Sequence, residues 1–419
     1  MEQSKNMTKR DDWESNEEIQ CLREYLRIPS VHPNVDYEPC LEFLKRQADS
    51  LELPYQIFYP ANEENPVFIM TWVGTDPKMP AILINSHMDV VPVYEENWNY
   101  PPFGAEMDDD GNIYARGAQD MKTVGIQQLA AIRALKKRGD RFKRTIHLSF
   151  VADEEMQRYG MVAFVKTEDF KNLNIGFTLD EGGPSPLDLL PVFYAERSVW
   201  RFTFKFSGTS GHGSSLFKDT AGEKLSFVVS KMMEWRKKEQ ATLESNPKLL
   251  LGDVTTINLT QLSGGVQTNV VPPLLTASFD VRLALKEDHE AVDKQIARWC
   301  DQAGGGIEIE YEHKLPKTPA TAIDETNLFW MAFKSGIEDL DLKILPMVCP
   351  GGTDSRYIRE VGIPALGFSP LPNTRILLHT DNEYVNADTF LSGIDVFKVI
   401  IPKLANATKC YCAYKRAEE

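Results

Sequence analysis

The chain has 419 residues, of which 42% are hydrophobic and 26% are charged, and its formal net charge is -15. A chain of this length is too long to fold around one ordinary hydrophobic core, so two domains are predicted. The acidic excess, without any run rich in Lys or Arg, argues against a nucleic-acid or anionic-membrane partner.

No stretch approaches the roughly 20 apolar residues that span a bilayer. The first 12 residues are polar and contain no apolar signal segment. We therefore expect a cytoplasmic protein that has no membrane anchor. The cysteines show no CxxC spacing and are expected to be reduced core or surface thiols; they are Cys21, Cys40, Cys300, Cys349, Cys410 and Cys412.

Short apolar strands alternate with helices in the first part of the chain. The pattern predicts helices at residues 14–27 and 121–138, and strands at 67–73, 81–85, 145–151 and 175–179. Helices interleaved with almost continuously apolar strands predict an α/β fold built around a mostly parallel sheet.

From residue 197 the pattern becomes that of a strand exposed on one face, because Trp200, Phe202, Phe204 and Phe206 alternate with other residues. The elements expected next are a helix near 219–239, strands at 253–261 and 274–285, a helix at 288–302 and a strand at 307–313. This β-α-β-β-α-β order is that of a ferredoxin-like sheet.

After residue 315 the α/β pattern returns, with helices predicted near 325–335 and 387–404 and strands at 342–348 and 364–368. The sequence therefore predicts a larger domain formed by residues 1–195 and 315–419. A smaller α+β domain, residues 196–314, is expected to be inserted into it.

Histidine and acidic side chains follow three of the predicted strands. They are His87 and Asp89, Glu154 and Glu155, and Asp180 and Glu181. A single residue of this kind after a strand is most often a turn or capping residue. Because the carboxyl ends of parallel strands share one edge of a sheet, all six residues are expected at one rim.

Imidazole and carboxylate ligands without cysteine suit a catalytic Zn²⁺ site, with Co²⁺ or Mn²⁺ as possible substitutes. Asp120 opens the helix at 121–138 and is placed to bridge two metals, which together activate a water and polarise a carbonyl. Asp89 lies two residues after His87 and can hold that ring in one tautomer instead of binding metal. Asp180 and Glu181 follow the same strand, and the pattern leaves open which of them is a ligand.

Seven motifs, in this order, resemble those of the M20 family of dizinc metallopeptidases: Ser86–Asp89, Arg116–Lys122, Asp153–Glu155, Leu179–Gly182, Ser210–Ser214, Gly351–Arg356 and His379–Glu383. Within this family the chain is most similar, over nearly its full length, to the branch that hydrolyses N-acylated amino acids. The segments Tyr194–Trp200 and Arg356–Pro370 carry that closer similarity.

The resemblance implies two Zn²⁺ ions per subunit, one bound by His87, Asp120 and Glu181 and the other by Asp120, Glu155 and His379. Of the two acidic residues that follow the strand at 175–179, the resemblance implies that Glu181, rather than Asp180, is the metal ligand. Glu154 is implied as the general base that deprotonates a metal-bridged water and later protonates the leaving amine. Asp89 is implied as the partner of His87. Without the resemblance, the alternative for His379 is that it simply ends a strand.

The resemblance also implies residues that contact the substrate. His212 is expected to donate to the substrate carbonyl, often from the neighbouring subunit of a dimer, with Asn269 as its companion. Arg356, and second Arg282, are candidates for the substrate carboxylate, because a guanidinium offers it a planar bidentate fork. The alternatives are a simple loop histidine for His212 and a solvated strand charge for Arg282.

The implied function is zinc-dependent hydrolysis of N-acyl-L-amino acids to a carboxylate and a free L-amino acid. The resemblance makes the larger domain catalytic and makes the inserted domain, 196–314, a lid through which a homodimer forms. An M20 dipeptidase or carboxypeptidase is the alternative, since the same chemistry cleaves any correctly placed amide. A non-catalytic binding protein on this fold requires a lost ligand or base, and none is lost. Two departures border the site: Met156–Gly160 lacks the usual adjacent glycines, and Gly213 replaces the usual Ala.

Overall fold

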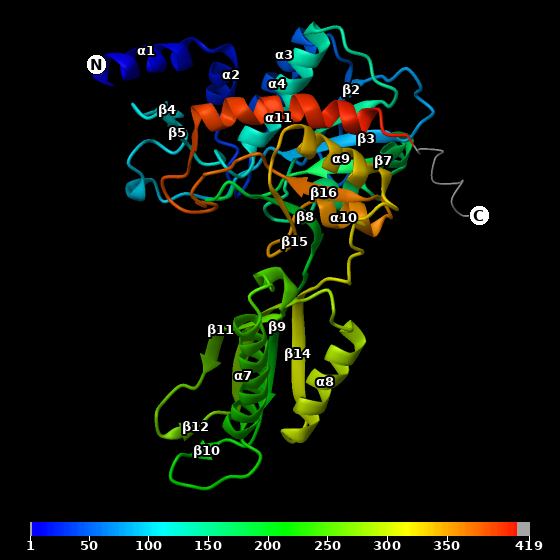
Figure 1. The fold of residues 1–419 in the computed structure, drawn as a ribbon. Coiled ribbons are helices and arrows are strands. Elements are labelled where there is room, and N and C mark those ends of the chain that lie inside the picture. Colours follow the sequence, from blue (N-terminus) through cyan, green and yellow to red (C-terminus); the bar gives the residue numbers. More distant parts are fainter. Residues whose placement is uncertain (1, 409–419) are drawn as a thin grey trace, which may run out of the picture. The chain divides into compact units, whose positions relative to one another are not determined.

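A computed structural model describes residues 2–408 (Figure 1). The chain forms two compact units. Unit 1 contains the residues up to Tyr194, Ala320–Pro346 and the residues from Thr353 onward, and unit 2 contains Ala195–Pro319 and Met347–Gly352. The short return segment Met347–Gly352, which the sequence pattern assigned to the larger domain, thus belongs to the smaller unit. Over residues 2–408, no helix is both long and apolar enough to cross a membrane.

Unit 1 is built on an eight-stranded sheet with the strand order β1-β2-β6-β3-β7-β16-β8-β15. The neighbouring strands β6, β3, β7 and β16 run parallel, and antiparallel strands flank them. The predicted α/β sheet with a parallel centre is confirmed. The strands are β1 (Tyr55–Phe58), β2 (Val67–Trp72), β3 (Ala81–His87), β6 (Ile146–Val151), β7 (Ile175–Asp180), β8 (Leu190–Glu196), β15 (Ile344–Cys349) and β16 (Ala365–Phe368).

Helices cover both faces of this sheet, because successive strand residues point to opposite sides. In β3, Ile82 and Ile84 join one apolar core, whereas Leu83 joins another. The first core is covered by α2 (Glu17–Leu26), α3 (Glu38–Ser50), α4 (Lys122–Lys137), α9 (Leu328–Asp339) and α11 (Ala387–Ala405). Helices α4 and α11 lie side by side on this face (Figure 1). The second core is covered by α5 (Gly160–Phe164), α6 (Glu168–Asn172) and α10 (Ser355–Glu360).

The single helix predicted at 14–27 is wrong in its bounds. The chain instead forms α1 (Glu2–Ser15) and then α2, separated by Asn16. The side chain of Asn16 accepts hydrogen bonds from the backbone N–H groups of Glu18 and Ile19, at 3.0 and 3.2 Å. This capping starts a new helix at that point.

Short elements complete unit 1. A three-stranded sheet has the order β17-β5-β4, formed by β4 (Glu106–Met107), β5 (Asn112–Tyr114) and β17 (Tyr384–Asn386), and one 3-10 turn spans Glu95–Asn97. Among the described residues, Cys21, Cys40 and Cys300 are free thiols, and Cys349 is buried. Cys410 and Cys412 lie outside the described residues.

Unit 2 is an antiparallel sheet with the order β11-β13-β9-β14, covered by two helices. Its elements are β9 (Ser198–Ser207), β10 (Gly211–His212), α7 (Ala221–Ser245), a 3-10 turn (Leu251–Asp253), β11 (Thr256–Gly264), β12 (Val270–Val271), β13 (Leu274–Leu283), α8 (His289–Gln302) and β14 (Ile307–Lys314). Phe202, Phe204 and Phe206 of β9 point inward and pack with Val228 of α7 and Ile296 of α8. The predicted ferredoxin-like arrangement is confirmed.

Candidate metal centre

Three neighbouring strands of unit 1 deliver the predicted polar residues to one edge of the sheet. Strand β3 ends at His87, β6 is followed by Glu154 and Glu155, and β7 is followed by Glu181. Because β6, β3 and β7 are parallel neighbours, these residues share the carboxyl edge where ligands of open α/β sheets bind.

The first cluster contains His87, Asp120 and Glu181. The Nε2 atom of His87 lies 3.0 Å from Asp120 Oδ1 and 3.5 Å from Glu181 Oε2. Its Nδ1 donates to the backbone carbonyl of Asp89 at 2.9 Å, so that in the neutral ring Nε2 keeps its lone pair. Ligand atoms of the three residues all lie within 4.8 Å of one another. This arrangement suits a divalent cation.

The second cluster shares Asp120 with the first. The Nε2 atom of His379 lies 3.1 Å from Asp120 Oδ2 and 3.1 Å from Glu155 Oε2. Hydrogen bonds to Asp120 and Glu155 raise the pKa of His379 to about 10. Burial opposes ionisation of Asp120, but hydrogen bonds from His379 and His87 hold its pKa well below the usual range. The two oxygens of Asp120 therefore face different histidines, as a bridging carboxylate requires.

Glu154 is buried beside these clusters without belonging to either. Burial, together with the charge of Glu181, raises the pKa of Glu154 well above its usual range. The Oε1 atoms of Glu154 and Glu155 are buried and have no hydrogen-bond partner within the described part of the chain. Buried carboxylate oxygens are normally paired. Such oxygens, next to a set of only N and O donors, fit a centre built for two metal ions.

Asp89 lies behind the acidic pair and fixes its backbone. Its Oδ1 accepts a hydrogen bond from the backbone N–H of Glu154 at 3.2 Å, and its Oδ2 accepts one from Glu155 at 3.0 Å. His32 Nε2 lies 2.8 Å from the same Oδ2. The carboxylate lies 3.6 Å from His87 Nδ1, so the main-chain carbonyl of Asp89 makes the closer contact with that ring. The sequence pattern did not indicate His32 as a candidate site residue.

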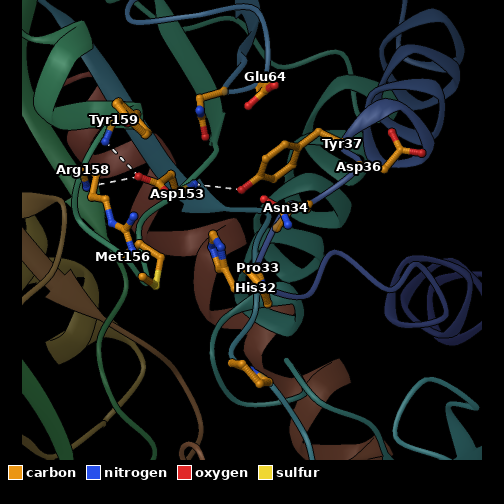
Figure 2. Close-up of a pocket in the computed structure, with 13 residues that line it drawn as sticks. His32, Pro33, Asn34, Asp36, Tyr37, Glu64, Asp153, Met156, Arg158 and Tyr159 are labelled. Carbon is orange, nitrogen blue, oxygen red and sulfur yellow. Dashed lines mark hydrogen bonds between the residues drawn. The ribbon is translucent and has the colours of Figure 1, made fainter.

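A pocket of about 630 Å³ lies beside these residues and is lined in part by His32 and Asp153 (Figure 2). Figure 2 shows the hydroxyl of Tyr37 directed at Asp153, whose backbone N–H donates to it at 3.0 Å. The Asp153 carboxylate accepts hydrogen bonds from the backbone N–H groups of Arg158 and Tyr159, at 3.1 and 2.8 Å. Met156, Arg158 and Tyr159, from the segment without the usual adjacent glycines, thus form one wall of this pocket.

Asp180 and Glu181 make different contacts. Asp180 Oδ1 accepts a hydrogen bond from Asn85 Nδ2 at 2.9 Å. Its Oδ2 accepts hydrogen bonds from the backbone N–H and the hydroxyl of Ser355, at 2.8 and 2.7 Å. Asp180 therefore faces Asn85 and Ser355, while Glu181 faces His87.

Two buried residues contact the loops of the second cluster and were not singled out by sequence. Gln119 and Glu383 both lie inside recognised motifs, but nothing in the spacing marked them. Burial raises the pKa of Glu383 to about 7.

His212 and Asn269 lie on adjacent segments of unit 2. Strands β10 and β12 pair His212 with Val270, and the N–H of Gly213 donates to the carbonyl of Asn269 at 2.8 Å. A Cβ added at Gly213 would lie 3.1 Å from that carbonyl oxygen, so the glycine permits the close approach. The His212 ring is exposed, with Nδ1 at 2.8 Å from Ser214 Oγ.

The two candidate arginines have different surroundings. Arg282 forms a bidentate pair with Asp280, with Nε at 2.7 Å from Oδ1 and Nη2 at 3.0 Å from Oδ2. Arg356 lies in α10 and is 1% exposed. A role in binding the substrate carboxylate stays a prediction for both.

Comparisons with known proteins identify the family of this chain. The family model "Peptidase family M20/M25/M40" matches residues 83–403. Aminoacylase-1 of Mus musculus is 46% identical over 404 residues, which cover 96% of this chain and 98% of the mouse protein. The M20 family metallo-carboxypeptidase Sso-CP2 from Sulfolobus solfataricus has the same fold, with a TM-score of 0.72 at 18% identity, covering 93% of this chain and 99% of that chain. The YXEP protein of Bacillus subtilis, described as a dinuclear metal binding peptidase from the M20 family, gives a TM-score of 0.68 at 17% identity, covering 93% and 98%. The chain therefore belongs to peptidase family M20/M25/M40.

Proposed function

We propose that this protein hydrolyses N-acyl-L-amino acids to a carboxylate and a free L-amino acid. The observation that carries the proposal is the 46% identity to mouse aminoacylase-1 over 98% of that protein. The paired clusters that share Asp120 support it, because they provide the two-metal chemistry that amide hydrolysis uses. Unit 1 is the proposed catalytic domain.

The proposed cofactor is a pair of Zn²⁺ ions, with Co²⁺ or Mn²⁺ as substitutes. His87, Asp120 and Glu181 would hold one ion, and Asp120, Glu155 and His379 the other. When bound, the ions supply Lewis-acid polarisation of the amide carbonyl and lower the pKa of water.

Glu154 is the proposed general base. It accepts a proton from the water that attacks the amide carbon and returns it to the amine nitrogen as the C–N bond breaks. Burial raises its pKa, which favours holding the proton between the two steps. The hydrogen bonds from the backbone of Glu154 and Glu155 to Asp89 keep the acid in place.

His212 and Asn269 are proposed to donate hydrogen bonds to the substrate carbonyl, with His212 supplied by the partner subunit of a homodimer. The proposal assigns dimerisation to unit 2. A mixture of Glu154→Gln and His212→Ala chains tests it, because a heterodimer then contains one intact site if His212 acts across the interface. Purified heterodimers should recover about half of the wild-type turnover, whereas His212 acting within its own chain leaves them inactive.

The substrate carboxylate is proposed to bind Arg356, with Arg282 as the second candidate. Replacing each with Lys keeps the charge but removes the bidentate fork. The residue that binds the carboxylate should show a raised KM for acetyl-methionine, and the other should not.

The substrate class is tested by comparing acetyl-methionine with an unblocked dipeptide, before and after metal chelation. Hydrolysis of acetyl-methionine that is lost on chelation and restored by Zn²⁺ is expected. Faster cleavage of the dipeptide would instead assign a dipeptidase activity, and release of a C-terminal residue from a longer peptide would assign a carboxypeptidase. The cytoplasmic location stays a prediction.

A further inference from the structure

Two loops of unit 1 carry the residues of the second cluster and contact each other along their length. The bridging loop, Arg116–Asp120, ends at the carboxylate shared by both clusters. The histidine loop, Arg375–Tyr384, carries His379. They are separated by more than 250 residues in sequence, yet several hydrogen bonds join them.

Glu383 of the histidine loop binds the backbone of the bridging loop. Its Oε1 accepts hydrogen bonds from the N–H groups of Gln119 and Asp120, at 2.6 and 3.3 Å. Its Oε2 accepts from the N–H of Gly117 at 3.2 Å and from Nη1 of Arg116 at 2.7 Å. The side chain is completely buried. One carboxylate therefore receives four donors from the segment that orients Asp120.

Gln119 of the bridging loop binds the backbone of the histidine loop in return. Its Nε2 donates to the carbonyls of Arg375 and Tyr384, both at 2.9 Å. Its Oε1 accepts from the N–H of Leu377, also at 2.9 Å. These three bonds hold the histidine loop on both sides of His379.

His379 depends on such support more than the other ligands do. Its side chain is 51% exposed, so packing fixes it only in part. Its φ of 58° lies in the left-handed region, which residues other than glycine seldom occupy unless their surroundings hold them there. The hydrogen bonds of Gln119 and Glu383 provide those surroundings.

We propose that Gln119 and Glu383 are positioning residues that form a reciprocal clasp between the two loops and set the metal affinity of the centre. The inference rests on the proposed two-metal function. The two residues act on different parts of the centre. Gln119 holds the loop of His379, which belongs only to the second cluster, whereas Glu383 holds Asp120, which belongs to both.

The test is Zn²⁺ titration of the metal-free, full-length protein by calorimetry, with competing chelators of known affinity. Gln119→Met keeps the side-chain length but removes all three hydrogen bonds. We expect the Zn²⁺ ion of the second cluster to bind at least tenfold more weakly, while the affinity of the first cluster for its ion is unchanged. Glu383→Gln should weaken both by at least tenfold. In both variants, excess Zn²⁺ should restore kcat toward the wild-type value, because neither residue touches substrate.

Gln128→Met is the matched control, since Gln128 is a buried glutamine of α4 outside the clasp, and it should bind both ions like wild type. Far-UV circular dichroism checks folding, and Glu383→Asp replaces Glu383→Gln if that chain does not fold. Wild-type affinities in the Gln119 and Glu383 variants, or equal losses in the Gln128 variant, would overturn the clasp. Acetyl-methionine hydrolysis by wild type is measured separately, so a failure of the proposed function leaves the metal result interpretable.

Discussion

The substitution Glu154→Gln separates the chemistry of the acidic pair from its metal binding. The change keeps the size of the side chain but removes its ability to carry a proton. Because Glu154 belongs to neither cluster, we expect both metal ions to remain bound. General acid–base catalysis contributes about 10²- to 10⁴-fold, so kcat should fall by that factor, which corresponds to about 3 to 5 kcal/mol of barrier.

The same substitution should stabilise the metal-free protein at neutral pH. Burial and the charges of Glu181, Asp354 and Glu155 raise the pKa of Glu154, so the native state holds a proton that the unfolded state releases above its ordinary pKa of 4.5. Wild-type stability therefore falls as pH rises through 4.5, and this loss is absent from the variant. Urea unfolding should show the more stable variant at pH 7 and a smaller difference at pH 4.

The substitution Glu155→Gln, one residue later, is expected to differ from Glu154→Gln in its effect on metal binding. Glu155 lies in the second cluster, so its loss should release one metal ion per chain. The assays are kcat on acetyl-methionine and metal content by mass spectrometry. Wild-type turnover of Glu154→Gln, or loss of metal from Glu154→Gln but not from Glu155→Gln, would refute the assigned division of labour.

Three further outcomes are expected. Gly367→Ala should lower the free energy of unfolding in urea by about 1–3 kcal/mol and weaken Zn²⁺ binding, because its Cβ would lie 2.3 Å from the backbone oxygen of Glu181. The control is Gly222→Ala, at an open helical position, which should be neutral or stabilising by up to about 1 kcal/mol. Burial lowers the pKa of His147 to about 4, so the unfolded state takes up a proton that the native state excludes. Stability should then drop by about 2 kcal/mol between pH 7.5 and pH 5, and His147→Gln should abolish that part of the drop. Zn²⁺ binding at pH 7 should displace a proton from His379, whose pKa is about 10 without metal; calorimetry in buffers of different ionisation enthalpy should count about one proton fewer for His379→Gln.

Local periodicity explains which parts of the fold were predictable. The inward aromatics of β9, from Trp200 to Phe206, alternate with a period of two, and this pattern needs no distant partner to be recognised. The break at Asn16 was missed because no apolar residue lies between Trp13 and Ile19 to mark where one helix ends, and only the capping hydrogen bonds separate the helices. Strands β4, β5 and β17 have two or three residues each, too few to show any period.

The site residues that could be predicted from the sequence pattern are those that lie at or just after the end of an apolar strand. His87, Glu154, Glu155 and Glu181 follow apolar strands that have to be buried, so their common edge follows from the fold class. The choice of Glu181 over Asp180 depended on motif similarity, because strand pattern alone does not say which side chain meets Asn85 and Ser355. His32 was not predictable, since its contact with Asp89 joins residues 57 positions apart.

The different environments of Glu154 and Glu155 depend on residues outside the pair. Asp89 binds the backbone N–H of both acids, so their carboxylates leave a fixed turn. Asp153, just before them, has a φ of 63°, a left-handed conformation secured by the hydroxyl of Tyr37. With the backbone fixed on both sides, the Glu155 carboxylate reaches His379, while the Glu154 carboxylate stays buried outside both clusters. Two chemically identical side chains can thus serve metal and proton separately, because the surrounding backbone decides which one meets the histidine.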